Sequence, residues 1–314
     1  MALLVLPAVI VAAPPKLILM VIVDDLGFGD VGFTRGGVNG SILPPNPEVF
    51  TPHMDALAGN GTVLTRAYVH QMCTPSRASF LTGRLPMHVQ DTLMNPEESA
   101  AGVPYNMSSI AQVLKRGGYS TAMVGKQDMG MATQTHTPRG RGFDQSLIYF
   151  EHKNDYYDQT LMQSVCQAYN PIVDLWEHNA TYAGPARALN GSGYEEYLFR
   201  DRVLQILAGH DFDAAPLFLL YTPHVAHCPL QVPPDWLARF QFADDEAACA
   251  AQTPYIFPGS GAGDYRCRSQ YHAMVALLDE VLGNVTGAIR ARGLWDETLM
   301  VLSSDNGGPS DPIE

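Results

Sequence analysis

The feature that most constrains this 314-residue chain is its alternation of apolar, strand-like runs with helical segments. Residues 17–23 read LILMVIV, a continuous apolar run that is typical of a parallel strand buried on both faces. Further strands are predicted over residues 119–124, 216–222 and 298–304, and helices over 51–59, from 106 or 108 to 117, 194–207 and 265–292. This alternation predicts an α/β fold in which helices flank a mostly parallel central sheet.

Polar side chains follow each predicted strand at the point where it ends. Because the carboxyl ends of parallel strands meet at one edge of a sheet, and open α/β sheets bind their ligands there, we expect these side chains to form a site. The residues concerned are Asp24, Asp25, Lys126, His224, His227, Asp305 and Asn306.

The most specific motif is CTPSRASFLTGR, residues 73–84. Taken alone, Cys73 could be a small buried thiol near a helix start. The whole motif resembles the signature of the type I, formylglycine-dependent sulfatases of the alkaline-phosphatase-like superfamily. The resemblance implies that a formylglycine-generating enzyme oxidises Cys73 to formylglycine during secretion. The hydrated aldehyde has a spare hydroxyl, so a sulfated intermediate can expel sulfate without a second attack at sulfur.

The same resemblance implies a metal site. Sulfatases carry an Asp-Asp pair after the first strand and an Asp-Asn pair after a later one, and both pairs are present here. With one oxygen from the modified cysteine they form an all-oxygen site, which suits Ca²⁺ or Mg²⁺ and offers zinc no soft ligand. We favour Ca²⁺, although either acidic pair alone is more often a loop start or helix cap. The implied ligands are Asp24, Asp25, Cys73, Asp305 and Asn306.

Three more residues match catalytic positions of the family. Arg77 lies four residues after Cys73, on the same face if the segment is helical, and would hold the formylglycine and the sulfate rather than form a surface ion pair. Lys126 matches the lysine of the family's G-K-W-H-x-G, which contacts sulfate oxygens. His227 begins HCPLQVP, similar to a block of the arylsulfatase B-like enzymes, and would donate a proton to the leaving alcohol. The flanks of His224 fit less well, so we expect a structural role there.

The chain departs from the family in two ways. Asp128 replaces a histidine that hydrogen-bonds the formylglycine hydroxyl and acts as a base when sulfate leaves. A carboxylate there would add negative charge beside an anion site, so we expect a changed pH optimum or lower activity. The resemblance covers residues 16–308, whereas family members continue with a second sulfate-binding lysine, more sheet and a C-terminal subdomain. No Lys or Arg follows Asn306, so we expect a fragment, a short form or an incomplete pocket.

Several features predict a eukaryotic secretory protein, secreted or lysosomal. Residues 1–13 resemble the apolar part of a signal peptide, without its basic start, and residues 16–314 would be the N-terminal catalytic domain of a sulfatase. Chance predicts roughly one Asn-x-Ser/Thr sequence, but six occur. The predicted glycosylation sites are Asn39, Asn60, Asn106, Asn179, Asn190 and Asn284.

Four cysteines remain if Cys73 is modified. In an oxidising compartment Cys166, Cys228, Cys249 and Cys267 could form two disulfides, in three possible pairings, or stay as free thiols. The short, Pro- and Gly-rich loop between Cys249 and Cys267 favours that pair.

Charge and hydropathy exclude two classes of partner. The net charge of −13 argues against a nucleic-acid surface. No stretch reaches the ~20 apolar residues that a membrane span needs.

Three functions remain open. The first is hydrolysis of sulfate monoesters of a sulfated small molecule or glycan. The signature sequence CTPSR at Cys73 and the sequence HCPLQVP that begins at His227 favour this reaction. The second is hydrolysis of phosphonates or phosphodiesters by the same nucleophile. The third is a weakly active or non-catalytic binding module, which Asp128 and the missing lysine favour.

Overall fold

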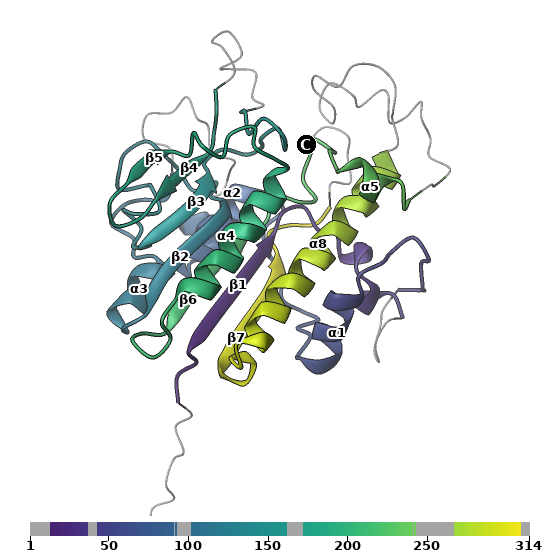
Figure 1. Cartoon of the computed structure of the whole chain (residues 1–314), viewed down its shortest axis with the longest axis horizontal. Coiled ribbons are helices and arrows are strands. Elements are labelled where there is room, and N and C mark those ends of the chain that lie inside the picture. Colours follow the sequence, from purple (N-terminus) through teal and green to yellow (C-terminus); the bar gives the residue numbers. More distant parts are fainter. Residues whose placement is uncertain are drawn as a thin grey trace, which may run out of the picture.

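The four strands predicted from the sequence lie side by side in one sheet. A computed structural model describes residues 13–36, 43–90, 92, 102–161, 172–240, 242 and 267–308. Within them a seven-stranded sheet has the order β5-β4-β3-β2-β6-β1-β7 (Figure 1). The strands are β1 (Leu17–Val23), β2 (Ser120–Lys126), β3 (Gln145–Tyr149), β4 (Trp176–His178), β5 (Ala183–Pro185), β6 (Leu217–Thr222) and β7 (Thr298–Ser304).

The four central pairings explain why the strand ends meet. β1 is parallel to both β6 and β7, and β2 is parallel to both β6 and β3. The two remaining pairings, β3 with β4 and β4 with β5, are antiparallel and lie at one side of the sheet. The predicted mostly parallel sheet is therefore confirmed, and the carboxyl ends of β1, β2, β3, β6 and β7 lie at one edge.

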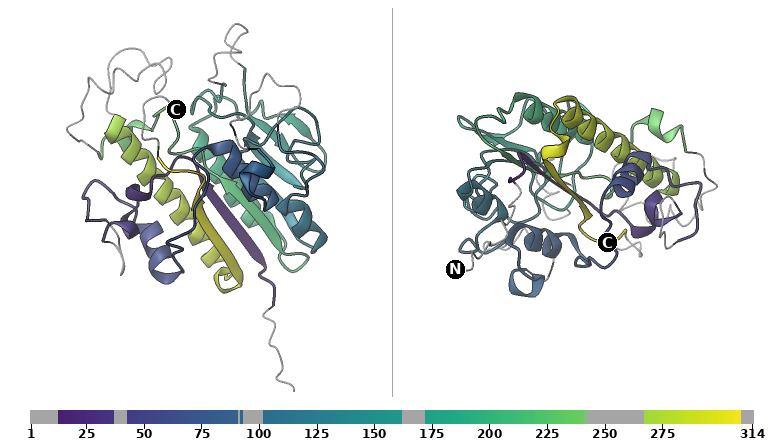
Figure 2. Two further views of the ribbon diagram at one scale, coloured as in Figure 1. Left: turned by 180° about the vertical axis from the view of Figure 1, so that it is seen from behind. Right: turned by 90° about the horizontal axis from the view of Figure 1, so that it is seen from below.

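Helices cover both faces of the sheet. The helices are α1 (Pro52–Asn60), α2 (Cys73–Thr82), α3 (Ile110–Arg116), α4 (Glu195–Gly209), α5 (Pro234–Leu237) and α8 (Cys267–Ala291). α4 and α8 lie over one face, and α2 and α3 over the other (Figure 2). Within the described residues, no helix combines the length and the apolar character that crossing a membrane needs.

The side chains of β1 alternate between two apolar cores. Leu17, Leu19 and Val21 pack into the core beneath α4 and α8, whereas Ile22 packs into the core beneath α2 and α3. Because successive side chains of a strand point to opposite faces, a strand covered on both sides must be apolar throughout. This is the physical reason that LILMVIV predicted a central strand.

The start of α3 differs from the prediction. Ser109, rather than Asn106 or Ser108, caps this helix. Its hydroxyl accepts a hydrogen bond from the N–H of Gln112, and the Gln112 side chain accepts one from the N–H of Ser109, both at 3.0 Å. This reciprocal pair satisfies two backbone donors at once, which favours the later start.

The N-terminus of α1 is capped by a side chain from α8. Thr51 occupies the N-cap position but makes no side-chain cap hydrogen bond. Instead, the Asp279 carboxyl accepts hydrogen bonds from the backbone N–H of His53 at 3.0 Å and of Met54 at 2.8 Å. Burial raises the pKa of Asp279 to about 6. The contact joins two helices that are far apart in sequence.

We predict that Asp279→Ala lowers the free energy of unfolding by about 1–3 kcal/mol, because two helix-terminal N–H groups lose their acceptor. Urea denaturation measures the change. Glu280→Gln alters the next residue of α8, which is exposed, and should change stability by less than ~0.5 kcal/mol. Equal stability of Asp279→Ala and the unmodified protein would contradict the capping role.

Candidate active site

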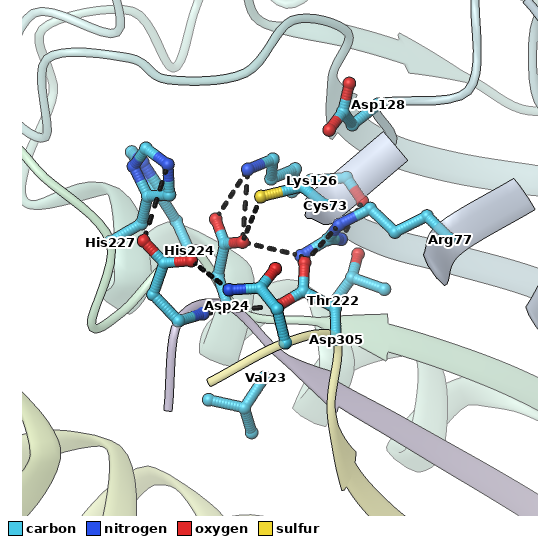
Figure 3. Close-up of polar contacts among 12 residues, drawn as sticks. Val23, Asp24, Cys73, Arg77, Lys126, Asp128, Thr222, His224, His227 and Asp305 are labelled. Atoms are coloured by element: carbon cyan, nitrogen blue, oxygen red, sulfur yellow. Dashed lines mark hydrogen bonds and ion pairs between the residues drawn. The ribbon is translucent and has the colours of Figure 1, made fainter. Parts of the chain in front are cut away.

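The predicted site residues meet at the carboxyl edge of the sheet, where α2 begins (Figure 3). Asp24 and Asp25 directly follow β1, and Asp305 directly follows β7. One ligand atom from each of these three residues, together with the Cys73 sulfur, forms a group whose atoms all lie within 4.8 Å of one another. Two neighbouring parallel strands and the first residue of α2 therefore build one cluster.

Cys73 is a neutral thiol in this cluster. Its Sγ donates a hydrogen bond to Asp24 Oδ1 at 3.6 Å, and its side chain is buried. Burial raises the pKa of Cys73 to about 12. Arg77 lies one helical turn after Cys73 in α2, and its side chain contacts the same cluster. Cys73 and Arg77 therefore lie on the same face of the helix, as predicted.

Two buried cations lie beside Cys73. Arg77 donates from Nη2 to Asp24 Oδ1 at 3.0 Å and from Nε to Asp305 Oδ2 at 2.9 Å. Lys126 Nζ lies 2.8 Å from Asp24 Oδ2 and 3.1 Å from Asp24 Oδ1. Burial alone would lower the pKa of Lys126, but Asp24 and the other negative groups nearby together outweigh it and raise this pKa. Both side chains are therefore charged where an anion would meet Cys73.

The oxygen side chains at the strand ends fit a hard cation. Asn306 Nδ2 donates to Asp25 Oδ1 at 2.6 Å, and the N–H of Asp25 donates to Asp305 Oδ1 at 3.2 Å. These bonds leave Asn306 Oδ1 buried without a hydrogen-bond partner among the described residues. Asp25 also has a left-handed backbone, with φ 52°, a conformation that non-glycine residues adopt mainly at turns and functional sites. Carboxylate and amide oxygens are the ligands that Ca²⁺ and Mg²⁺ prefer.

The two histidines after β6 both enter the cluster. His227 Nε2 lies 3.6 Å from Asp25 Oδ2. Burial alone would lower the pKa of His227, but Asp25 contributes to raising it well above its ordinary value. His224 contacts the buried Glu195 through Nδ1 at 2.8 Å, which agrees with the predicted structural role. However, His224 Nε2 is buried without a hydrogen-bond partner among the described residues, and that role does not explain it.

Comparison with known proteins decides the family. The model of the sulfatase family matches residues 16–312. The chain belongs to the sulfatase family. Arylsulfatase J of Mus musculus is 32% identical over 295 residues, which are 93% of this chain and 42% of the mouse protein. Arylsulfatase A of Homo sapiens is 30% identical over 321 residues, 95% of this chain and 53% of the human protein.

A solved structure supports the same fold. The crystal structure of Ps i-CgsB in complex with k-i-k-neocarrahexaose has a TM-score of 0.70 and 27% sequence identity, over 94% of this chain and 59% of that chain. The alkaline-phosphatase-like fold expected of a sulfatase is thus confirmed. The chain spans about half the length of the curated relatives it matches.

Asp128 is not the uncompensated charge that the sequence predicted. His152, on the segment after β3, places Nδ1 2.9 Å from Asp128 Oδ1, and the Thr74 hydroxyl donates to the same oxygen at 3.0 Å. Burial alone would raise the pKa of Asp128, but His152, together with Lys126 and Arg77, outweighs it and lowers the pKa to about 2. In this chain, therefore, an aspartate–histidine pair stands where the family has a histidine. No motif marked His152 in the sequence.

The cysteines correct a second expectation. Cys228 is a free thiol, so the alternative of two disulfides among the four remaining cysteines is wrong. Cys267 is disulfide-bonded, and Cys166 and Cys249 lie outside the described residues, so the Cys249–Cys267 pairing stays a prediction. Burial alone would raise the pKa of Cys228, but the neighbouring His227 contributes to lowering it.

We predict that Cys228 reacts with iodoacetamide much faster than Cys73 in protein whose Cys73 is unconverted. A pKa of about 12, raised by burial, leaves Cys73 about 10³-fold less thiolate at pH 8 than an ordinary thiol, whereas His227 favours the Cys228 thiolate. Peptide mass spectrometry over time measures both rates, and Cys228→Ser identifies the fast site. Equal rates at the two cysteines would refute the burial argument.

We also predict that Asp128 and His152 stabilise the fold as a pair. Removing His152 leaves the buried Asp128 carboxylate without this partner, and removing Asp128 leaves the half-buried His152 ring without its acceptor. Each change should cost up to ~3 kcal/mol, and the double variant should cost less than the sum. Because His152 holds the pKa of Asp128 at about 2, below the ordinary ~3.9, this stabilisation is present above about pH 4 and is lost as the pH falls through 2. Urea unfolding of Asp128→Ala, His152→Ala and the double variant tests this, and strictly additive losses would show no coupling.

Proposed function

We propose that this chain is a sulfuric ester hydrolase that cleaves sulfate monoesters of sulfated sugars. The observation that carries the proposal is the convergence of charged Arg77 and Lys126 beside Cys73, next to four oxygen side chains. The chain as a whole carries a charge of −13, so it repels anions at long range and needs cations at the point of binding. Family membership and the names of the relatives support the same reaction.

The proposal requires one modification and one metal ion. Formylglycine formed from Cys73 by the formylglycine-generating enzyme would supply a hydrate whose one hydroxyl attacks sulfur and whose other hydroxyl lets sulfate leave. Asp24, Asp25, Asp305 and Asn306 would hold Ca²⁺, with Mg²⁺ as the alternative, and a hard cation there adds positive charge beside the sulfate oxygens. The unpartnered Asn306 Oδ1 supports this ligand set.

The chain's own side chains bind the anion and hold the proton. Arg77 and Lys126 bind sulfate oxygens, and their contacts with Asp24 fix where their charges point. His227 holds a proton at Nε2, because Asp25 contributes to keeping its pKa well above the ordinary value despite burial. That proton passes to the leaving alcohol as the ester bond breaks.

One contact weighs against a non-catalytic role. Asp128, which seemed to add charge to the anion site, is paired with His152.

We further propose that the protein is a glycoprotein of the secretory pathway, secreted or lysosomal. The asparagines of four sequons are exposed, at Asn60, Asn106, Asn179 and Asn284, whereas Asn190 is half-buried. Exposure is what attachment of a glycan requires. Asn39 and residues 1–12 of the predicted signal peptide lie outside the described residues.

The proposed function predicts that Cys73→Ala abolishes multiple turnover of an aryl sulfate without unfolding the protein. Cys73→Ser should at most form one covalent sulfate ester per molecule, because it lacks the second hydroxyl. Protein co-produced with the formylglycine-generating enzyme is assayed for sulfate release, and intact mass reports the conversion of Cys73. Ser79→Ala serves as a control in α2, since the Ser79 hydroxyl donates to the Pro75 carbonyl at 2.9 Å and bonds no site residue among those that the structure describes.

Three outcomes separate the alternatives. Multiple turnover by Cys73→Ala would refute the proposed nucleophile. Faster hydrolysis of an aryl phosphonate than of the aryl sulfate by converted protein would instead favour the phosphonate or phosphodiester reaction. Fully converted protein that hydrolyses neither substrate would favour a binding module.

A further inference from the structure

A second group of ligand atoms lies beside the oxygen cluster. Asp24, His224 and His227 each offer one atom, and the three atoms lie within 4.8 Å of one another. All three residues are buried. Figure 3 shows both imidazoles on one side of Asp24, with Arg77 on the other. This group contains two ring nitrogens, so its ligand chemistry differs from that of the all-oxygen cluster.

Both imidazoles are held through Nδ1. This leaves Nε2 of His224 available to a ligand, and Nε2 of His227, which lies 3.6 Å from Asp25 Oδ2, can bind a metal once it gives up its proton. His224 Nδ1 contacts Glu195 Oε2 at 2.8 Å, and His227 Nδ1 contacts the carbonyl oxygen of Cys228 at 2.6 Å. Histidines that bind metals almost always donate the other ring N–H to a carboxylate or a backbone carbonyl. Here each ring has one of these two acceptors.

The His224 ring is fixed by its surroundings. It stacks on Tyr156 with ring centroids 4.1 Å apart and an interplanar angle of 10°, and it lies 4.8 Å from the Tyr149 ring. Its partner Glu195 is held in turn by Asn154, whose Nδ2 donates to Glu195 Oε1 at 3.1 Å. A metal ligand needs such an outer layer, because the layer sets the direction of the lone pair.

His224 Nε2 is the least satisfied polar atom of this group. The residue is 0% exposed, and Nε2 has no hydrogen-bond partner among the described residues. When Nδ1–H donates to Glu195, the lone pair of the ring lies on Nε2. A buried lone pair without a donor calls for a bound cation or proton donor.

We propose that Asp24, His224 and His227 form a second metal site, which binds a divalent transition metal of the zinc type. Two imidazole nitrogens and one carboxylate oxygen, with a fourth position open, are a ligand set that zinc prefers, whereas Ca²⁺ and Mg²⁺ prefer oxygen alone. Asp24 has two carboxylate oxygens, so it can serve both clusters. The site itself does not depend on the proposed hydrolytic function.

The charges around the site limit its affinity. Lys126 Nζ already contacts both Asp24 oxygens and must give up one of them to the metal. The carboxylates of Asp25 and Asp305 offset part of the repulsion from Lys126 and Arg77. We therefore expect micromolar rather than nanomolar binding. If His227 is the proton donor of the hydrolase, zinc on its Nε2 removes that donor and inhibits turnover, a consequence that rests on the proposed function.

Direct metal binding tests the site without using activity. Zn²⁺ is titrated against a chromophoric chelator, and Co²⁺ is followed by its visible absorption, in a Cys73→Ala background that removes the nearest sulfur. We expect one equivalent of zinc, visible Co²⁺ bands of a four-coordinate site, and loss of affinity of at least ~10-fold in His224→Gln and in Glu195→Gln. His210→Gln is the matched control, because that half-buried ring bonds the Ala215 carbonyl at 2.8 Å and lies outside both clusters.

Several results would overturn the assignment. Absence of stoichiometric zinc binding would do so, as would unchanged affinity in both His224→Gln and Glu195→Gln. A sulfur-to-cobalt charge-transfer band would place Cys228 among the ligands instead. Loss of zinc in Asn306→Ala, with retention in His224→Gln, would place the metal in the oxygen cluster. Thermal unfolding of each variant shows whether it still folds. If His224→Gln does not fold, Glu195→Gln still tests the site, because it leaves all three metal ligands in place.

Discussion

The site depends on one fully buried carboxylate, that of Asp24. It accepts hydrogen bonds from Arg77 at 3.0 Å, from Lys126 at 2.8 Å and from the Cys73 thiol at 3.6 Å. Taking such charges out of water costs several kcal/mol each, and only close mutual contact offsets that cost. The start of α2 and the ends of β1 and β2 must therefore meet at one point, because each of these elements supplies members of the group. The order of the parallel strands makes this possible, since β6 alone separates β1 from β2.

Burial and charge pairing together explain how an acidic protein can offer a cationic pocket. Charge interactions are much stronger in a low-dielectric interior than across the surface, so local arrangement outweighs the net charge. Lys126 stays protonated because Asp24 and the other negative groups nearby together outweigh its burial and raise its pKa. The Asp128–His152 pair resembles this arrangement, since a second buried carboxylate has a basic side chain beside it. Asp24 and Asp128 therefore each have a basic partner nearby.

The predictable parts of the molecule were those with local signals. The predicted strands 17–23 and 298–304 agree with β1 and β7 residue for residue. Each is an apolar run that is followed directly by polar residues, and such a run can be recognised in the sequence. β4 and β5 have only three residues each, too few for a recognisable period, and they were missed. Glu195 and His152 were missed for another reason. Acidic residues are common at helix starts such as that of α4, and only the tertiary structure shows that Glu195 is buried against His224.

The oxygen cluster also links a central strand of the sheet to an edge strand. β1 lies between two strands, whereas β7 is an edge strand whose Leu299 and Val301 side chains are 51% and 39% exposed. Edge strands with exposed backbone open more easily than central ones. Asp305, at the end of β7, is held to the centre by Arg77 and by the N–H of Asp25. Any cation bound between the ends of β1 and β7 favours the closed arrangement by mass action, so ligand binding and the order of this edge are coupled.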